Sequence, residues 1–127
     1  MSKEPPCKAL PQEFAEAVAR RFSVLGEATR VRLLDCLIEN GESSVQELSE
    51  LLELPHANVS KHLNVLHGER IVGRRKRATK ALYRVTDETI LGVCQLVCGG
   101  IRDQLRDLGE LAQGSGARAF GQELSRR

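Results

Sequence analysis

Two short helical segments separated by a tight turn constrain this chain more than any other feature. Ser44 followed three residues later by Glu47 is a capping box, which predicts the start of a short helix. Leu54 and Pro55 then indicate a turn, because proline suits the first turn of a following helix, which we expect to run to about Glu69. Two helices joined in this way form a helix-turn-helix arrangement.

The remaining patterns predict one mainly helical domain with a small β-hairpin. Apolar residues spaced three and four apart indicate two helices before the turn, over 12–25 and 27–39, and a long helix over 87–113. Strands are expected over 71–77 and 81–85, where β-branched and aromatic residues gather. We divide the 127 residues into a flexible arm (1–11), one folded domain (12–113) and a flexible tail (114–127).

Charge is separated along the chain although the net charge is only +2. Every charged residue from 35 to 54 is acidic, whereas 56–84 holds eight lysines and arginines against Glu69 alone. Five of the basic residues lie around the hairpin tip, where they can reach phosphates or a minor groove. The tip lacks the glycine or asparagine of a tight turn, so we expect a longer or mobile loop there. These five candidate DNA contacts are Arg74, Arg75, Lys76, Arg77 and Lys80.

The second helix of a helix-turn-helix enters the major groove, so its polar side chains are candidates for DNA contact. Asn58 suits adenine, and Lys61 suits guanine or phosphate. On an isolated helix these residues would indicate only a solvated face, but the preceding turn and the following basic hairpin favour DNA binding. The candidates on this helix are His56, Asn58, Ser60, Lys61, His62 and Asn64.

Four segments resemble the ArsR/SmtB family of winged-helix repressors. They are FSVLGEATRVRLL (22–34), VQEL (45–48), VSKHLNVL (59–66) and YRV (83–85). The resemblance covers roughly 14–111 and implies a winged helix-turn-helix with five helices and a hairpin. It also implies a homodimer joined by the first and last helices, an operator of double-stranded DNA with dyad symmetry, and repression relieved when an effector binds.

The cysteines are the candidate effector ligands. Cys94 and Cys98 are four apart on one helix face, so they can donate two thiolates to a thiophilic ion such as As(III), Cd or Zn. Cys7, Cys36 or the same two cysteines of the partner helix are the candidates for the further ligands. No cysteine lies in 44–48 and no histidine follows His67, so neither familiar metal motif of the family is present. The alternative is apolar packing, because a heptad-like stripe predicts a dimer seam. That stripe is Cys94, Cys98, Ile101, Leu105, Leu108 and Ala112.

Two other functions remain open for the cysteines. The resemblance places Cys36 where persulfide-responsive relatives carry a reactive cysteine, with Cys98 as its partner, although the register of the last helix differs. A family member without an effector site is the other alternative. An enzyme is not expected, because the chain has no nucleophile elbow, phosphate loop or Cys-x-x-Cys pair. A cytoplasmic protein is expected, since no signal peptide or membrane-length apolar run is present.

Overall fold

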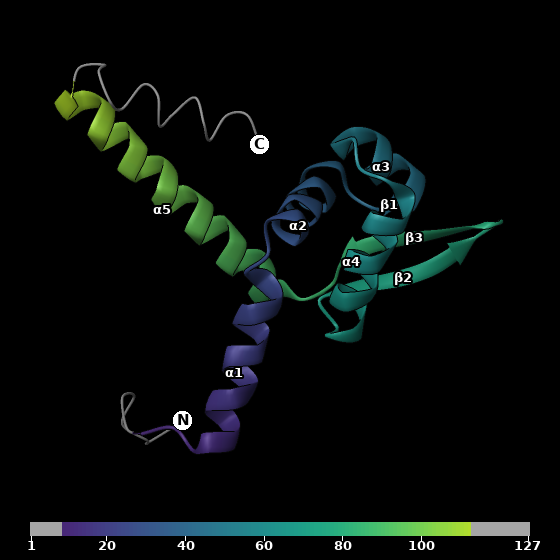
Figure 1. The fold of residues 1–127 in the computed structure, drawn as a ribbon, viewed down its shortest axis with the longest axis horizontal. Helices are drawn as coiled ribbons and strands as arrows, with labels where there is room; N and C mark the ends of the chain where they lie inside the picture. The colour runs from purple at the N-terminus through teal and green to yellow at the C-terminus, as the bar shows by residue number, and fades with distance from the viewer. Residues whose placement is uncertain (1–8, 113–127) are drawn as a thin grey trace.

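The computed structural model describes residues 9–112, which form five helices and a small antiparallel sheet. Figure 1 shows α1 and α5 extending away from a central body, while a β-hairpin projects from its other side. The expected mainly helical architecture is confirmed. Residues 1–8 of the predicted arm and the whole predicted tail lie outside the described residues. The elements are α1 (Gln12–Leu25), α2 (Ala28–Asn40), β1 (Ser43–Ser44), α3 (Val45–Leu52), α4 (His56–Gly68), β2 (Val72–Arg77), β3 (Lys80–Val85) and α5 (Glu88–Ala112).

Leucine-rich faces of α2, α3 and α4 pack on the base of the hairpin and form the core. Burying each of these side chains contributes roughly 1.5–3 kcal/mol relative to leaving it in water. None of the described helices is both long and apolar enough to cross a membrane. The most completely buried side chains are Leu33, Leu34, Leu48, Val59, Leu63, Leu66, Ile71 and Val72.

The start of α3 is fixed by the predicted capping box. The Ser44 hydroxyl accepts a hydrogen bond from the Glu47 amide at 3.1 Å, and the Ser44 amide donates to Glu47 Oε1 at 2.8 Å. Each side chain therefore satisfies a backbone N–H that the helix leaves free.

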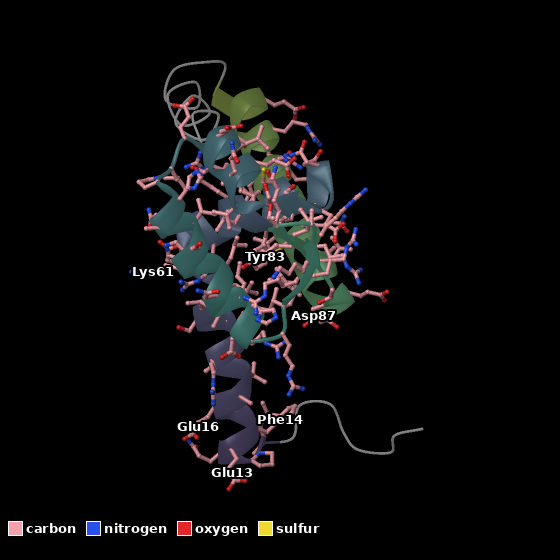
Figure 2. All side chains as sticks on the ribbon, turned by 90° about the vertical axis from the view of Figure 1, so that its right-hand side faces the viewer. Glu13, Phe14, Glu16, Lys61, Tyr83 and Asp87 are labelled. Carbon is pink, nitrogen blue, oxygen red and sulfur yellow. The ribbon has the colours of Figure 1, made fainter. Side chains whose placement is uncertain are left out.

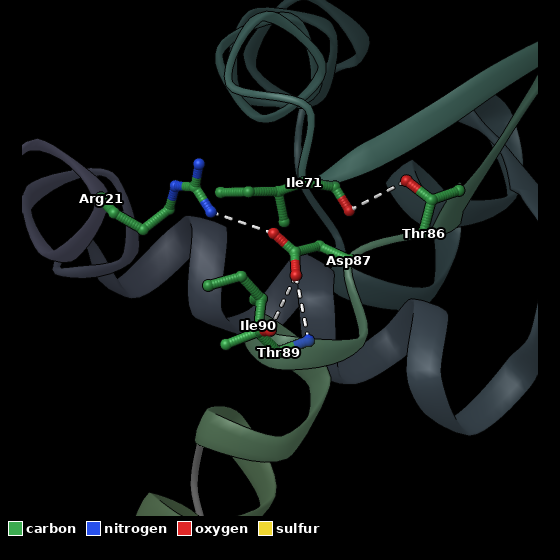
Figure 3. Close-up of polar contacts among 6 residues, drawn as sticks. All are labelled: Arg21, Ile71, Thr86, Asp87, Thr89 and Ile90. Carbon is green, nitrogen blue, oxygen red and sulfur yellow. Dashed lines mark hydrogen bonds and ion pairs between the residues drawn. The ribbon is translucent and has the colours of Figure 1, made fainter. Parts of the chain in front are cut away.

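Asp87 fixes both the start of α5 and the position of α1 (Figure 3). Its Oδ1 accepts hydrogen bonds from the Thr89 amide at 3.0 Å and the Ile90 amide at 3.2 Å, as expected of an N-terminal cap. Its Oδ2 lies 3.0 Å from Nη1 of Arg21 on α1. One carboxylate thus ties together the two helices that extend from the body.

The sheet differs from the predicted two-stranded hairpin by an added strand. Its order is β1-β3-β2, and the two residues of β1 pair with Tyr83 and Leu82 of β3. Such a short strand carries no periodic signal, so the sequence could not predict it.

The hairpin tip is a two-residue turn, so the expected longer loop was wrong. Arg77 pairs with Lys80, which leaves only Ala78 and Thr79 between the strands. Ala78 takes a φ of 56°, a backbone conformation usually left to glycine or asparagine. The strand pairing on both sides imposes this angle on an alanine.

Candidate nucleic-acid interface

The helix-turn-helix is formed by α3 and α4, which pack on one another. The turn between them depends on Glu53, whose φ of 56° reverses the chain at the end of α3. Ser49 closes the turn, since its backbone oxygen accepts from the Leu54 amide at 3.1 Å and its hydroxyl donates to the Leu54 carbonyl. Pro55 then precedes α4, as the sequence predicted.

One face of α4 is buried and the other is open to solvent. Val59, Leu63 and Leu66 are fully buried and hold the helix on the core. Lys61 lies on the outer side of α4 (Figure 2). Of the DNA contacts predicted on α4, three are exposed: His56, Lys61 and Asn64. Two others, Asn58 and Ser60, are half-buried.

His62 is placed differently from the other predicted contacts. Only 8% of the residue is exposed, and its Nδ1 lies 3.1 Å from Nη1 of Arg30 on α2. Because a guanidinium can only donate, Nδ1 of His62 accepts this hydrogen bond. The imidazole is thus used inside the protein, and we remove His62 from the candidate DNA contacts.

Arg30 is a residue whose role the sequence did not reveal. Its Nε donates to the Val24 carbonyl at 2.7 Å, and its backbone amide donates to Glu27 Oε1 at 3.0 Å. The hydrogen bond from that amide, together with the positive charge of the Arg30 guanidinium, lowers the pKa of Glu27. Arg30 therefore joins the end of α1, the start of α2 and the buried face of α4. Arg30 lies in one of the segments that resemble the ArsR/SmtB family (22–34), and His62 lies in another (59–66). That shared resemblance was the one sequence signal that could have linked the two residues.

The hairpin presents its basic residues on two faces. Cross-strand partners share a face of a sheet, so Arg74 lies with the buried Tyr83, whereas Arg75 lies with Leu82 and Arg77 with Lys80. The five predicted residues are all exposed. Arg74 and Lys76 thus occupy the face that continues from the core, and Arg75, Arg77 and Lys80 occupy the outer face.

Of the five hairpin residues predicted to contact DNA, Arg75 is the one that forms an ion pair within the described part of the chain. Its Nε lies 2.7 Å from Oε2 of Glu42, and its Nη2 donates to Oε1 at 2.8 Å. The hydrogen bonds from Arg75 are the main reason that the pKa of Glu42 is lowered.

The three described cysteines line two adjoining cavities between α2 and α5. A cavity of about 250 Å³ contains Cys94, Cys98 and the carboxylates of Asp35 and Glu39. Cys36 lines the second cavity together with Cys98. Among the described residues, no three histidine, cysteine or carboxylate side chains are grouped closely enough to hold a metal ion. Cys7, the predicted third ligand, lies outside those residues.

Burial alters the chemistry of two of these thiols. Desolvation raises the pKa of Cys36, and desolvation together with the neighbouring Cys98 and Asp35 raises the pKa of Cys94. Both side chains therefore hold their protons more tightly than a free cysteine does.

Apolar side chains remain exposed on α1 and α5. The residues predicted to form the dimer seam on α5 have two different surroundings in the described chain. Cys94 and Cys98 face the cavity against α2, while Ile101 and Leu108 are exposed. Figure 2 shows Phe14 at the far end of α1, away from the body. The large apolar residues exposed on these helices are Phe14, Phe22, Leu96, Val97, Ile101 and Leu108.

Known proteins share this arrangement. A family model described as bacterial regulatory protein, arsR family, matches residues 27–73, which contain α2, α3 and α4. The uncharacterized HTH-type transcriptional regulator MJ1325 of Methanocaldococcus jannaschii is 34% identical over 85 residues, covering 67% of this chain and 96% of that protein. The chain belongs to the ArsR family of transcriptional regulators. It is thus a DNA-binding regulator and not an enzyme.

Solved structures of ArsR-type proteins have the same fold. The antimony-specific transcriptional repressor AntR matches with a TM-score of 0.73 and 26% identity, covering 84% of this chain and 98% of AntR. A homodimeric winged helix-turn-helix DNA-binding domain of Mycobacterium bovis matches with a TM-score of 0.66 and 24% identity, covering 81% and 92% of the two chains. The β2–β3 hairpin of this ArsR-family chain is accordingly the wing of a winged helix-turn-helix.

Proposed function

We propose that the chain is a cytoplasmic, homodimeric repressor that leaves a dyad-symmetric operator when Cys94 and Cys98 bind a thiophilic ion. The observation that carries the DNA-binding part is the open face of α4 beside a wing with exposed basic residues. A helix in the major groove reads bases, and the flanking cations hold phosphates.

Dimerisation is supported by the apolar surface of α1 and α5. Leu96 is 77% exposed and Phe22 is 61% exposed, and no described element of the same chain packs extensively on α5. Apolar side chains gathered on two projecting helices favour association with a second copy. The Mycobacterium bovis neighbour is itself homodimeric. Two copies of α4 related by a twofold axis would require an operator with the same symmetry.

Replacing Arg77 by glutamine should weaken DNA binding equally on all sequences. If this residue holds a phosphate, the slope of log K against log salt should become less steep by about 0.9 for each phosphate that the wing no longer neutralises. Fluorescence anisotropy over a range of salt concentrations measures this slope. Arg20→Gln, which removes the same charge from the exposed face of α1, serves as the control. An Arg77 variant with the slope of the unmodified protein would contradict wing–phosphate contact.

Sensing of a thiophilic ion is supported by the position of the two cysteines. Cys94 and Cys98 face one cavity against α2, and α2 packs on α4. An ion bound to these thiolates would change how α5 lies against α2, the helix on which the recognition helix rests. AntR, which is 26% identical, is a repressor specific for antimony, an element of the same thiophilic class as arsenic. Cys7 or the cysteines of the second copy would complete the ligand set.

Burial of Cys36 disfavours an oxidant or persulfide as the effector. Such chemistry needs a thiolate that is already formed, and desolvation raises the pKa of Cys36. Cys36 is buried, and its Sγ is 3.6 Å from the Asn40 amide. Since Cys36 and Cys98 line one cavity, a thiol switch between them is the second candidate function.

The reduced protein, bound to DNA upstream of its own gene, should be released by As(III), Cd or Zn. We expect one of these ions to lower DNA affinity by about 5-fold to 150-fold, the usual size of such coupling. Cys94→Ser and Cys98→Ser should abolish the response, and Cys36→Ser should retain it. Anisotropy titrations with each ion provide the measurement. Binding that no ion disturbs, but that persulfide weakens through Cys36, would replace ion sensing by the thiol switch.

A further inference from the structure

Arg75 and Glu42 form a two-point ion pair on the outer face of the wing. The two contacts are 2.7 Å, between Nε and Oε2, and 2.8 Å, between Nη2 and Oε1. A guanidinium held at two points by one carboxylate has a defined orientation, which isolated surface pairs usually lack.

The pair spans the whole sheet. Arg75 belongs to β2, and Glu42 lies in the link between α2 and β1, at the opposite edge. Both Arg75 and Ser44 of β1 pair with Leu82 of the central strand β3, so the arginine reaches over that strand. Because β1 contributes only two residues, the ion pair is a substantial part of the connection between the wing and the end of α2.

Glu42 also lies within the positive field of the outer face. Arg77 and Arg84 add to the effect of Arg75 in lowering its pKa. If Arg75 served DNA directly, a carboxylate beside it would reduce its attraction for phosphate. Engagement by Glu42 instead occupies two of the guanidinium N–H groups and offsets its charge.

We propose that Arg75 positions the wing through Glu42 rather than by contacting DNA. This inference rests on the proposed contact of the wing with DNA. The phosphate contacts are then supplied by the other basic residues of the wing, Arg74, Lys76, Arg77 and Lys80. The Arg75–Glu42 pair sets the angle at which the hairpin leaves the body.

The sign of the Glu42→Gln effect distinguishes the two roles of Arg75. This substitution removes a negative charge near the wing, so electrostatics alone would strengthen DNA binding. Loss of positioning would weaken it. We expect Glu42→Gln and Arg75→Gln each to weaken binding by about threefold to fivefold, and the double variant to weaken it no further, because all three variants lack the same ion pair. Glu50→Gln, which removes an exposed carboxylate from α3, is the matched control and should not weaken binding.

Two further measurements separate positioning from phosphate contact. The salt slope of Arg75→Gln should equal that of the unmodified protein, and amide hydrogen exchange along β2 should become faster in both single variants. A less steep slope for Arg75→Gln, unchanged exchange, or an affinity of Glu42→Gln at or above that of the unmodified protein would overturn the proposal. Failure of the wing to contact DNA at all is detected independently, by the slope of Arg77→Gln.

Discussion

Glutamate at both Val97 and Ile101 of α5 is expected to leave the protein monomeric and to weaken operator binding by at least about a hundredfold. The two side chains are 54% and 43% exposed and lie one helical turn apart. In a helix–helix seam each glutamate would have to lose its water without gaining a partner, which is costly. Two separate monomers would then bind half-sites without the gain in effective concentration that a dimer supplies.

Analytical ultracentrifugation and anisotropy on the same samples measure the two effects of this double variant. Leu51→Glu is the matched control, because Leu51 is a leucine of 56% exposure on α3, away from the proposed seam. It should leave the oligomeric state unchanged. A dimer of full DNA affinity that carries both glutamates on α5 would show that the copies associate through another surface.

Local signals account for most of what could be predicted about the fold. The capping box of Ser44 and Glu47 involves residues three apart, and the structure contains both of its hydrogen bonds. Such contacts depend only on neighbouring residue types, so they are visible in the sequence. Family membership confirms the helix-turn-helix that these signals delimit.

Contacts between distant segments could not be predicted, and they change the candidate site. His62 carries the right chemistry for DNA but faces Arg30, 32 positions away. Arg75 looks like its basic neighbours until the fold places Glu42, 33 positions away, beside it. In both cases the rotation of a helix or the alternation of a strand decides which side chains lie beside one another. Composition and spacing do not contain that information.

The seam and the hairpin tip show two further limits. The stripe from Cys94 to Ala112 predicted a seam with a second copy. In the described chain Cys94 and Cys98 line a cavity against α2, while Ile101 and Leu108 are exposed. Periodicity gives the face of a helix but not its partner. At the tip, strand pairing holds Ala78 at a φ of 56°, against its local preference.

Arg30→Ala is expected to lower the free energy of unfolding by about 1.5–3 kcal/mol, the range for hydrogen bonds that involve a charged group. The substitution removes the donor to the Val24 carbonyl, at 2.7 Å, and the donor to His62 Nδ1, at 3.1 Å. Val24 and His62 are each 8% exposed, so water replaces these hydrogen bonds poorly. Arg30→Lys should not restore stability, because one ammonium group cannot reproduce the planar fork that serves both acceptors.

Urea denaturation followed by circular dichroism measures the loss, with Arg32→Ala as the control two positions away. Within the described residues the Arg32 side chain makes one hydrogen bond, 3.4 Å long, to the Leu52 carbonyl, and its removal should cost much less. Because Arg30 also holds the buried face of α4, the Arg30→Ala variant should bind DNA more weakly at temperatures where it remains folded. Equal stability of the two alanine variants would contradict the network. In that case burial of Val59, Leu63 and Leu66 would suffice to set the orientation of the recognition helix.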